Sequence, residues 1–261
     1  MPLYHRAKQK IKLSPVSTMH YIKLIFRSIL FLIALCIYIL HWRPNSVDLF
    51  GANKTVPLFL IFIWIVFAIE MLFRFFPSNL ESPGCQKQFA KKYRPRKKLQ
   101  TKGLLHSAKS TFSVFLAWIL LNAVIGGLYF VHLIDKGILL LICLAYSICD
   151  MICILFFCPF QTWFMKNKCC TTCRIYNWDF AMMFTPFVFI PSFYTWSLLL
   201  ISLILLAVWE MAVFRYPERF SEETNASITC ANCNEKLCHH KTQLQHFLKK
   251  RNQLLKHSFK K

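Results

Sequence analysis

The chain has 261 residues, of which 56% are hydrophobic and 16% aromatic, and its formal net charge is +21. In a soluble basic protein the charges would cover the whole surface, but here the lysines and arginines lie between long apolar runs. This pattern excludes an ordinary soluble domain and predicts an all-α protein that crosses a membrane.

Five apolar runs are long enough to span a bilayer, whose hydrocarbon core is about 30 Å thick and needs ~20 apolar residues. A sixth run, 179–193, is shorter and contains Pro186 and Pro191. At about 1.5 Å per residue it covers only ~22 Å as a helix, so we expect a tilted or kinked span or a re-entrant segment. The five longer runs are 24–40, 57–76, 112–133, 138–160 and 196–214.

The distribution of lysine and arginine indicates how these spans are oriented. Positive residues concentrate in cytoplasmic segments. Six crossings place every strongly basic segment on that side, whereas five would place the basic tail outside. We therefore predict a six-helix transmembrane bundle of three helical hairpins with both termini in the cytoplasm. The hairpins are 24–76, 112–160 and 179–215, and the cytoplasmic segments are the arm 1–23, the loop 77–111, the loop 161–178 and the tail 216–261.

Three acids lie inside the predicted spans, each shortly before the proline that ends the span: Glu70, Asp150 and Glu210. Ionisable groups at this depth face the bundle interior or a water-filled cavity and often mark ion or proton routes. A simpler alternative is local pairing, of Glu70 with Arg74 and of Glu210 with Arg215. Asp150 has no basic residue within a turn. Its partner must come from another helix, or it is protonated.

Two Cys-x-x-Cys pairs predict a metal site. Zinc takes four ligands in a tetrahedron, and this spacing brings two sulfurs to one ion. The topology places both pairs on the reducing side of the membrane, where disulfides rarely persist. We predict a structural Zn²⁺ site that ties the loop 161–178 to the tail. The alternatives are an iron–sulfur cluster on the same thiolates or thiols without a metal. The predicted ligands are Cys170, Cys173, Cys230 and Cys233, with Cys169, Cys238 and His239 as substitutes.

The basic segments also predict contact with lipid. The run 87–102 is rich in Lys and Arg beside a predicted span, a position where basic clusters usually meet anionic lipid head groups rather than nucleic acid. After the second cysteine pair, Leu244, Phe247, Leu248 and Phe259 lie along one helical side among lysines. This pattern predicts an amphipathic C-terminal helix on the inner leaflet. Nothing in the sequence indicates a protein partner.

The segment 170–179 reads CTTCRIYNWD and follows Cys158-Pro-Phe160. It resembles uncharacterised bacterial multi-spanning integral membrane proteins that carry a CxxCRIYNWD segment. The resemblance covers the last two hairpins best and implies a bacterial cytoplasmic membrane. It brings no activity and no residue roles.

Three functions are therefore open. The first is a scaffold or regulatory membrane protein held together by the zinc site. The second is a small-solute or ion transporter that uses Glu70, Asp150 or Glu210 in its pathway. The third is an electron-transfer component with an iron–sulfur cluster. No phosphate-binding loop, nucleophile motif or zincin motif supports an enzyme.

Overall fold

A computed structural model describes residues 14–41, 55–96, 102–167, 169–233 and 235. In this part of the chain the regular structure is helical, as the sequence predicts. The predicted amphipathic helix of the tail, and the substitute ligands Cys238 and His239, lie outside the described residues.

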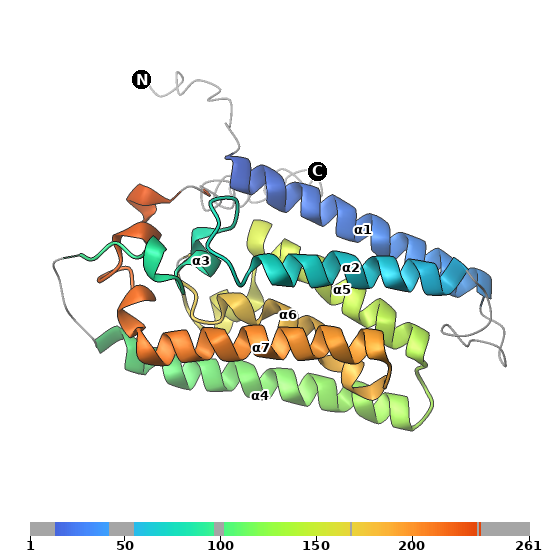
Figure 1. Ribbon diagram of the computed structural model, residues 1–261. Helices are drawn as coiled ribbons and strands as arrows, with labels where there is room; N and C mark the ends of the chain where they lie inside the picture. The colour runs from blue at the N-terminus through green and yellow to red at the C-terminus, as the bar shows by residue number, and fades with distance from the viewer. Residues whose placement is uncertain (1–13, 42–54, 97–101, 168, 234, 236–261) are drawn as a thin grey trace, which may run out of the picture.

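Five long helices lie side by side (Figure 1). Helix α1 packs against α5, and α2 packs against α7. Four helices of the described chain contain segments long and apolar enough to cross a membrane: Pro15–Leu40, Lys109–Phe130, Lys136–Leu155 and Phe193–Arg215. The apolar part of α2, Leu58–Phe73, is shorter. The helices are α1 (Pro15–His41), α2 (Thr55–Phe73), α4 (Lys102–Phe130), α5 (Lys136–Leu155) and α7 (Phe193–Arg215).

The sixth predicted span is not one helix, so a bundle of six continuous spanning helices is not confirmed. Helix α6 (Asp179–Phe184) continues as a 3₁₀ turn, Thr185–Phe189, and the chain then leads into α7 through Pro191. Pro186 has no N–H for an α-helical hydrogen bond, which favours the change of helix type. This segment packs against α4, α5 and α7. Irregular backbone at membrane depth is tolerated where protein surrounds it in this way.

The apolar core lies between α2, α5, α6 and α7. Phe67 of α2 meets Phe184 of α6 edge to face at 5.3 Å between ring centroids, and Phe184 stacks on Phe187 at 5.5 Å. Met71 and Leu205 are fully buried beside them. The outward faces of the long helices expose large apolar side chains instead, as lipid-facing helices do.

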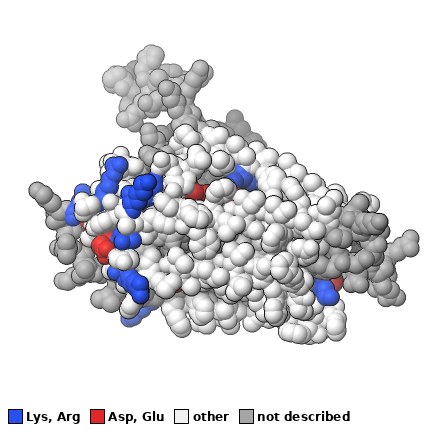
Figure 2. Space-filling view, viewed as in Figure 1, with Lys and Arg blue, Asp and Glu red and all other residues white. Residues whose placement is uncertain are grey.

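One end of the bundle carries a folded polar cap, which we define as residues 77–96, 165–178 and 216–235. On the face seen in Figure 2 the basic side chains gather mainly at this end. The backbone joins the first and last segments, because Arg96 N–H donates to the Thr224 oxygen at 2.9 Å and Ala226 N–H donates to the Arg94 oxygen at 2.8 Å. The cap is therefore a structured part of the protein and not a set of separate loops.

Lys87 lies at the centre of the cap and is fully buried. Its ammonium donates to the backbone oxygens of Thr171 at 2.9 Å and Cys173 at 2.7 Å. It also lies 5.3 Å from the Trp209 ring and 5.5 Å from the Phe220 ring, within the range of cation–π attraction. Burial lowers the pKa of Lys87 to about 8. This one side chain joins all three segments of the cap to α7.

Replacing Lys87 tests this role. Lys87→Met keeps most of the side-chain volume but leaves two buried carbonyl oxygens without their donor, which costs about 1–3 kcal/mol for each group. We expect faster hydrogen exchange at residues 169–175 and a lower melting temperature. The exposed Lys91 supplies the control, because Lys91→Met should change neither. Equal exchange in the two variants would contradict the role of Lys87.

The same lysine predicts a pH dependence. Its pKa is about 8 in the folded protein against an ordinary value of 10.5, so between these values the unfolded chain binds more protons. The contribution of Lys87 to stability therefore rises with pH across this window. The unfolding free energy of the wild type should increase relative to that of Lys87→Met between pH 8 and pH 10. A parallel pH profile in the two proteins would show that the ammonium is not buried.

Candidate functional site

Arg27 of α1 is the centre of a charged network inside the bundle, and its side chain is only 2% exposed. One guanidinium nitrogen donates to Glu70 of α2 at 2.7 Å, and another donates to Asp150 of α5 at 3.2 Å and to the Ser147 backbone oxygen at 2.9 Å. A planar guanidinium with donors on several sides suits such branched pairing. Arg27 thus connects three helices.

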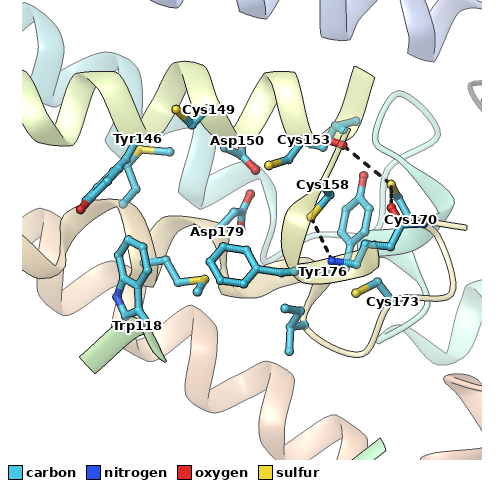
Figure 3. Close-up of a pocket in the computed structure, with 16 residues that line it drawn as sticks. Trp118, Tyr146, Cys149, Asp150, Cys153, Cys158, Cys170, Cys173, Tyr176 and Asp179 are labelled. Carbon is cyan, nitrogen blue, oxygen red and sulfur yellow. Dashed lines mark hydrogen bonds between the residues drawn. The ribbon is translucent and has the colours of Figure 1, made fainter. Parts of the chain in front are cut away.

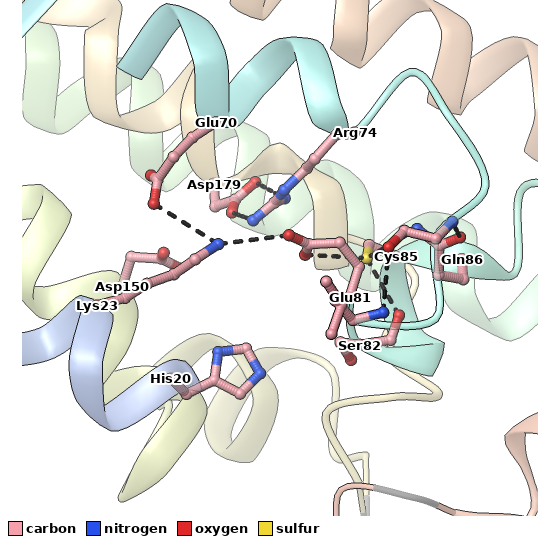
Figure 4. A network of polar contacts seen from close by, with 12 residues as sticks. His20, Lys23, Glu70, Arg74, Glu81, Ser82, Cys85, Gln86, Asp150 and Asp179 are labelled. Atoms are coloured by element: carbon pink, nitrogen blue, oxygen red, sulfur yellow. Dashed lines mark hydrogen bonds and ion pairs between the residues drawn. The ribbon is translucent and has the colours of Figure 1, made fainter. Parts of the chain in front are cut away.

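Lys23 lies one helical turn before Arg27, so both side chains lie on one face of α1. Its ammonium is 3.6 Å from Glu70 and 3.4 Å from Glu81 of the cap (Figure 4). Lys23 therefore pairs with one carboxylate of α2 and with one of the cap. Outside the spans, Arg74 and Lys23 lower the pKa of Glu81 against the opposing effect of burial, which is the largest single influence.

The predicted pair of Glu70 and Arg74 is wrong. Arg74 follows the last residue of α2, and its side chain reaches Asp179 at the start of α6 (Figure 4). There it pairs with Asp179 at 2.6 Å and donates to Asn177 at 3.1 Å. The Phe180 ring lies 4.5 Å from its guanidinium. Glu70 takes its partners from α1 instead.

The predicted pair of Glu210 and Arg215 is also wrong. Arg174 donates to both oxygens of the Glu210 carboxylate, one of them at 2.6 Å. Trp178 donates its indole N–H to the same carboxylate at 2.7 Å. Both partners belong to the CTTCRIYNWD segment, which the fold lays against α7. The tertiary contact therefore replaces the local one.

Asp150 has a partner from another helix, so the alternative of an unpaired Asp150 is wrong. Its carboxylate meets Arg27 and lies opposite the Asp179 carboxylate (Figure 3). The two aspartates line one cavity of about 140 Å³ at the junction of the bundle and the cap. Sequence reasoning missed Asp179 as a site residue, although it ends the CTTCRIYNWD segment and begins α6.

The network holds more negative than positive charge. In the described part of the chain, Arg27 and its neighbours provide three cations against four carboxylates. A buried charge without compensation costs several kcal/mol, so this arrangement favours one additional proton or cation. The cations are Lys23, Arg27 and Arg74, and the carboxylates belong to Glu70, Glu81, Asp150 and Asp179.

The same cavity is rich in sulfur. Helix α5, the turn after it, the cap and α6 each direct sulfur side chains to its wall (Figure 3). Cys170 lies 2.8 Å from the Gln161 side-chain oxygen, and the Gln161 N–H donates to the Cys158 sulfur at 3.3 Å. We call this space the sulfur-lined cavity. Its sulfur residues are Cys149, Cys153, Cys158, Cys170, Cys173, Met182 and Met183.

The predicted tetrahedron of Cys170, Cys173, Cys230 and Cys233 is not formed. Cys170 and Cys173 face the sulfur-lined cavity, whereas Cys230 begins an exposed turn of the tail. Among the residues that the structure describes, no group of three or more His, Cys, Asp and Glu side chains is arranged to hold a metal ion. The described residues therefore give no support to zinc or to a four-cysteine iron–sulfur cluster on these cysteines, and both stay predictions.

The tail has other anchors, which explain this separation. The backbone oxygen of Glu235 accepts from the Ser17 hydroxyl at 2.5 Å and from the Ser14 hydroxyl at 3.3 Å. The Glu235 carboxylate lies 3.4 Å from His20. These contacts hold the end of the described tail on the first turns of α1. A zinc ion completed by Cys238 or His239 stays a prediction.

No protein family, curated protein or solved structure matches this chain. Four helices of the described chain are long and apolar enough to cross a membrane, which is compatible with an integral membrane protein. The bacterial origin and the cytoplasmic position of the termini stay predictions.

The charged network predicts an asymmetry between two substitutions. Arg27→Met removes the only cation between Glu70 and Asp150 in the described structure, and breaking such a buried pair costs about 3–5 kcal/mol. Asp150→Asn removes the excess negative charge and leaves Arg27 paired with Glu70. We expect Arg27→Met to lower the melting temperature in detergent strongly and Asp150→Asn to change it little. A larger loss for Asp150→Asn would contradict the count of charges.

Cysteine reactivity offers a second test of the cap. Burial raises the pKa of the Cys85 thiol to about 12, and the thiolate is the reactive form. Cys230 is exposed. In native protein near neutral pH, a water-soluble maleimide should modify Cys230 quickly and Cys85 only after unfolding, as read by peptide mass spectrometry. Rapid labelling of Cys85 in the native protein would show that the cap is open.

Proposed function

We propose that this protein is an integral membrane protein of the ion-transporter class that binds a proton or a small monovalent cation at Asp150 and Asp179. One observation supports this proposal: the buried network has one more carboxylate than it has cations, and Asp150 and Asp179 connect it to the cavity. Paired carboxylates that share a site retain one proton readily, because two adjacent negative charges repel each other. Intramembrane acids of this kind mark ion or proton routes.

The walls of the cavity support this reading. Trp118 and Tyr146 lie beside the aspartates, with ring centroids 5.0 Å apart. Aromatic walls exclude water and so strengthen the attraction between a carboxylate and a cation. A divalent ion such as Ca²⁺ needs six or more oxygen ligands. Two aspartates fit a proton or a weakly coordinated monovalent ion better.

Ion binding has a structural consequence for the helices. Asp150 and Glu70 compete for Arg27. A proton or cation at Asp150 weakens its attraction to the guanidinium and leaves Arg27 to Glu70. The link between α1 and α5 then loosens while the link between α1 and α2 tightens. A change of this kind in one buried pair is a means by which ion occupancy can shift the packing of helices.

The cap supports a second candidate, a scaffold or regulatory membrane protein. Its three segments are joined through the buried Lys87 and through backbone hydrogen bonds, so it offers a fixed surface next to the membrane. A zinc ion with Cys238 or His239 among its ligands belongs to this candidate. The cytoplasmic orientation, the bacterial membrane and the contact with anionic lipid head groups are common to both candidates.

Infrared spectroscopy and cation binding test the ion-transporter proposal. Purified protein in detergent near neutral pH should show a protonated-carboxyl band, or else a melting temperature that rises with Na⁺ or K⁺ concentration through linkage to the folded state. Either signal should disappear in Asp150→Asn and in Asp179→Asn. The matched control is Glu223→Gln, which changes an exposed carboxylate of the cap and should keep the signal.

The alternatives have distinct results. Neither signal in the wild type, or a signal that persists in both aspartate variants, would overturn the proposal. If both variants lose the signal, ion flux is measured next in proteoliposomes. The wild type should transport the ion, and Asp150→Asn and Asp179→Asn should not. Binding that requires Asp150 but never supports flux under an imposed potential and ion gradient would favour the regulatory candidate.

A further inference from the structure

The sulfur-lined cavity combines residues that the sequence analysis treated separately. Cys153 lies near the end of α5, Cys158 follows in the turn after the helix, and Cys170 comes from the cap. The fold also brings Met182 and Met183 of α6 to the same wall. A small space bordered by this many thiols and thioethers is chemically distinctive, because sulfur is the preferred donor of soft metal ions.

The closest thiols come from both sides of the junction between bundle and cap. The Cys153 and Cys158 side chains both border the cavity, Cys153 from α5 and Cys158 from the turn after it (Figure 3). The Cys170 sulfur lies 4.0 Å from the Cys153 backbone oxygen and 2.8 Å from the Gln161 side-chain oxygen. Cys153 and Cys158 can therefore offer two sulfur donors to one ion, and Cys170 borders the same cavity.

The number of ligands decides which ion fits. Zinc and iron–sulfur clusters take four protein ligands, and in the described residues no group of three or more His, Cys, Asp and Glu side chains is arranged for a metal. A soft monovalent ion accepts two thiolates, with or without a thioether, and Cu(I) is the biological ion that such ligands select. The cavity therefore matches the low coordination number of Cu(I) and not a tetrahedral dication.

We propose that Cys153 and Cys158, with Cys170 beside them, bind Cu(I) in the sulfur-lined cavity. This inference goes beyond the proposed function, because it adds a separate site for a soft ion to the cavity that Asp150 and Asp179 line. In the binding step both S–H bonds break, two Cu–S bonds form, and two protons leave to water. The copper keeps its oxidation state, and the bis-thiolate complex carries one negative charge. Met182 and Met183 line the same cavity, and thioethers bind Cu(I) well.

The test is competition for Cu(I) with a chromogenic chelator, carried out on full-length protein in detergent without oxygen. We expect one equivalent of Cu(I) to be withdrawn from the chelator. Cys153→Ser and Cys158→Ser should each weaken binding by more than ~10-fold, the least that loss of even an outer-sphere group usually costs a metal site. Ag(I), a redox-inactive probe, should bind with the same dependence by elemental analysis.

Control variants separate this site from the others. Cys36→Ser on α1 and Cys230→Ser in the tail change exposed cysteines away from the cavity, and both should bind Cu(I) like the wild type. Equal melting temperatures of the Cys153 and Cys158 variants and the wild type, without metal, would show that the fold is kept. If either variant unfolds, two other measurements provide the same information. Cys158→Ala should also weaken Cu(I) binding. In the native wild type, prior addition of Ag(I) should prevent alkylation of Cys153.

Three outcomes would overturn the proposal: no Cu(I) withdrawn from the chelator, binding in Cys153→Ser and Cys158→Ser equal to that of the wild type, or loss of binding in Cys230→Ser. These are distinguishable from failure of the proposed function. Signals that depend on Asp150 with no copper binding would reject only the Cu(I) site. Copper binding with no signal that depends on Asp150 or Asp179 would reject only the ion-binding role of the aspartates.

Discussion

The buried guanidinium of Arg27 is the interaction on which the bundle depends. It lies within a helix long and apolar enough to cross a membrane, where a charge is costly unless it is paired. Its partners come from α2 and α5, so the cost of burying Arg27 is offset only when all three helices are in place. Apolar packing between lipid-exposed helices discriminates weakly among arrangements. The ion pairs of Arg27 therefore specify which helix lies next to α1, and they fix the depth at which the carboxylates meet.

The cap and the bundle are held together by similar means. Arg74 at the end of α2 meets Asp179 at the start of α6, and Glu210 of α7 meets Arg174 of the cap. Each pair joins a long helix of the bundle to the CTTCRIYNWD segment. Lys87 adds two hydrogen bonds to the same segment from the other side. The segment that stands out in the sequence is thus the joint between cap and bundle, and its Cys170 and Cys173 face the cavity because of that position.

The spans could be predicted from the sequence because hydrophobic length is a local property, and Pro186 and Pro191 correctly marked the weak point of the sixth run. The pairing of charges could not be predicted in the same way. The helix rule of neighbours one turn apart suggested Arg74 for Glu70 and Arg215 for Glu210, yet the partner of Glu70 is 43 residues away and that of Glu210 is 36 away. A signal was present in Arg27, a lone cation inside the first apolar run. Such a residue requires a carboxylate from another helix. Asp150 in turn had no basic residue within a turn to pair with.

The positions of the cysteines could not be predicted from local spacing either. Cys-x-x-Cys spacing describes one turn of chain, and it cannot show whether two turns face each other. The tail is held at Asn225 and Glu235 by the loop 77–96 and by α1, so Cys230 is placed by contacts that have no relation to metal chemistry. Cys170 is instead brought to Cys153, which the sequence places within a helix and gives no obvious ligand role. Because two carboxylates and five thiols border one cavity, proton chemistry and soft-ion chemistry become possible within the same small space.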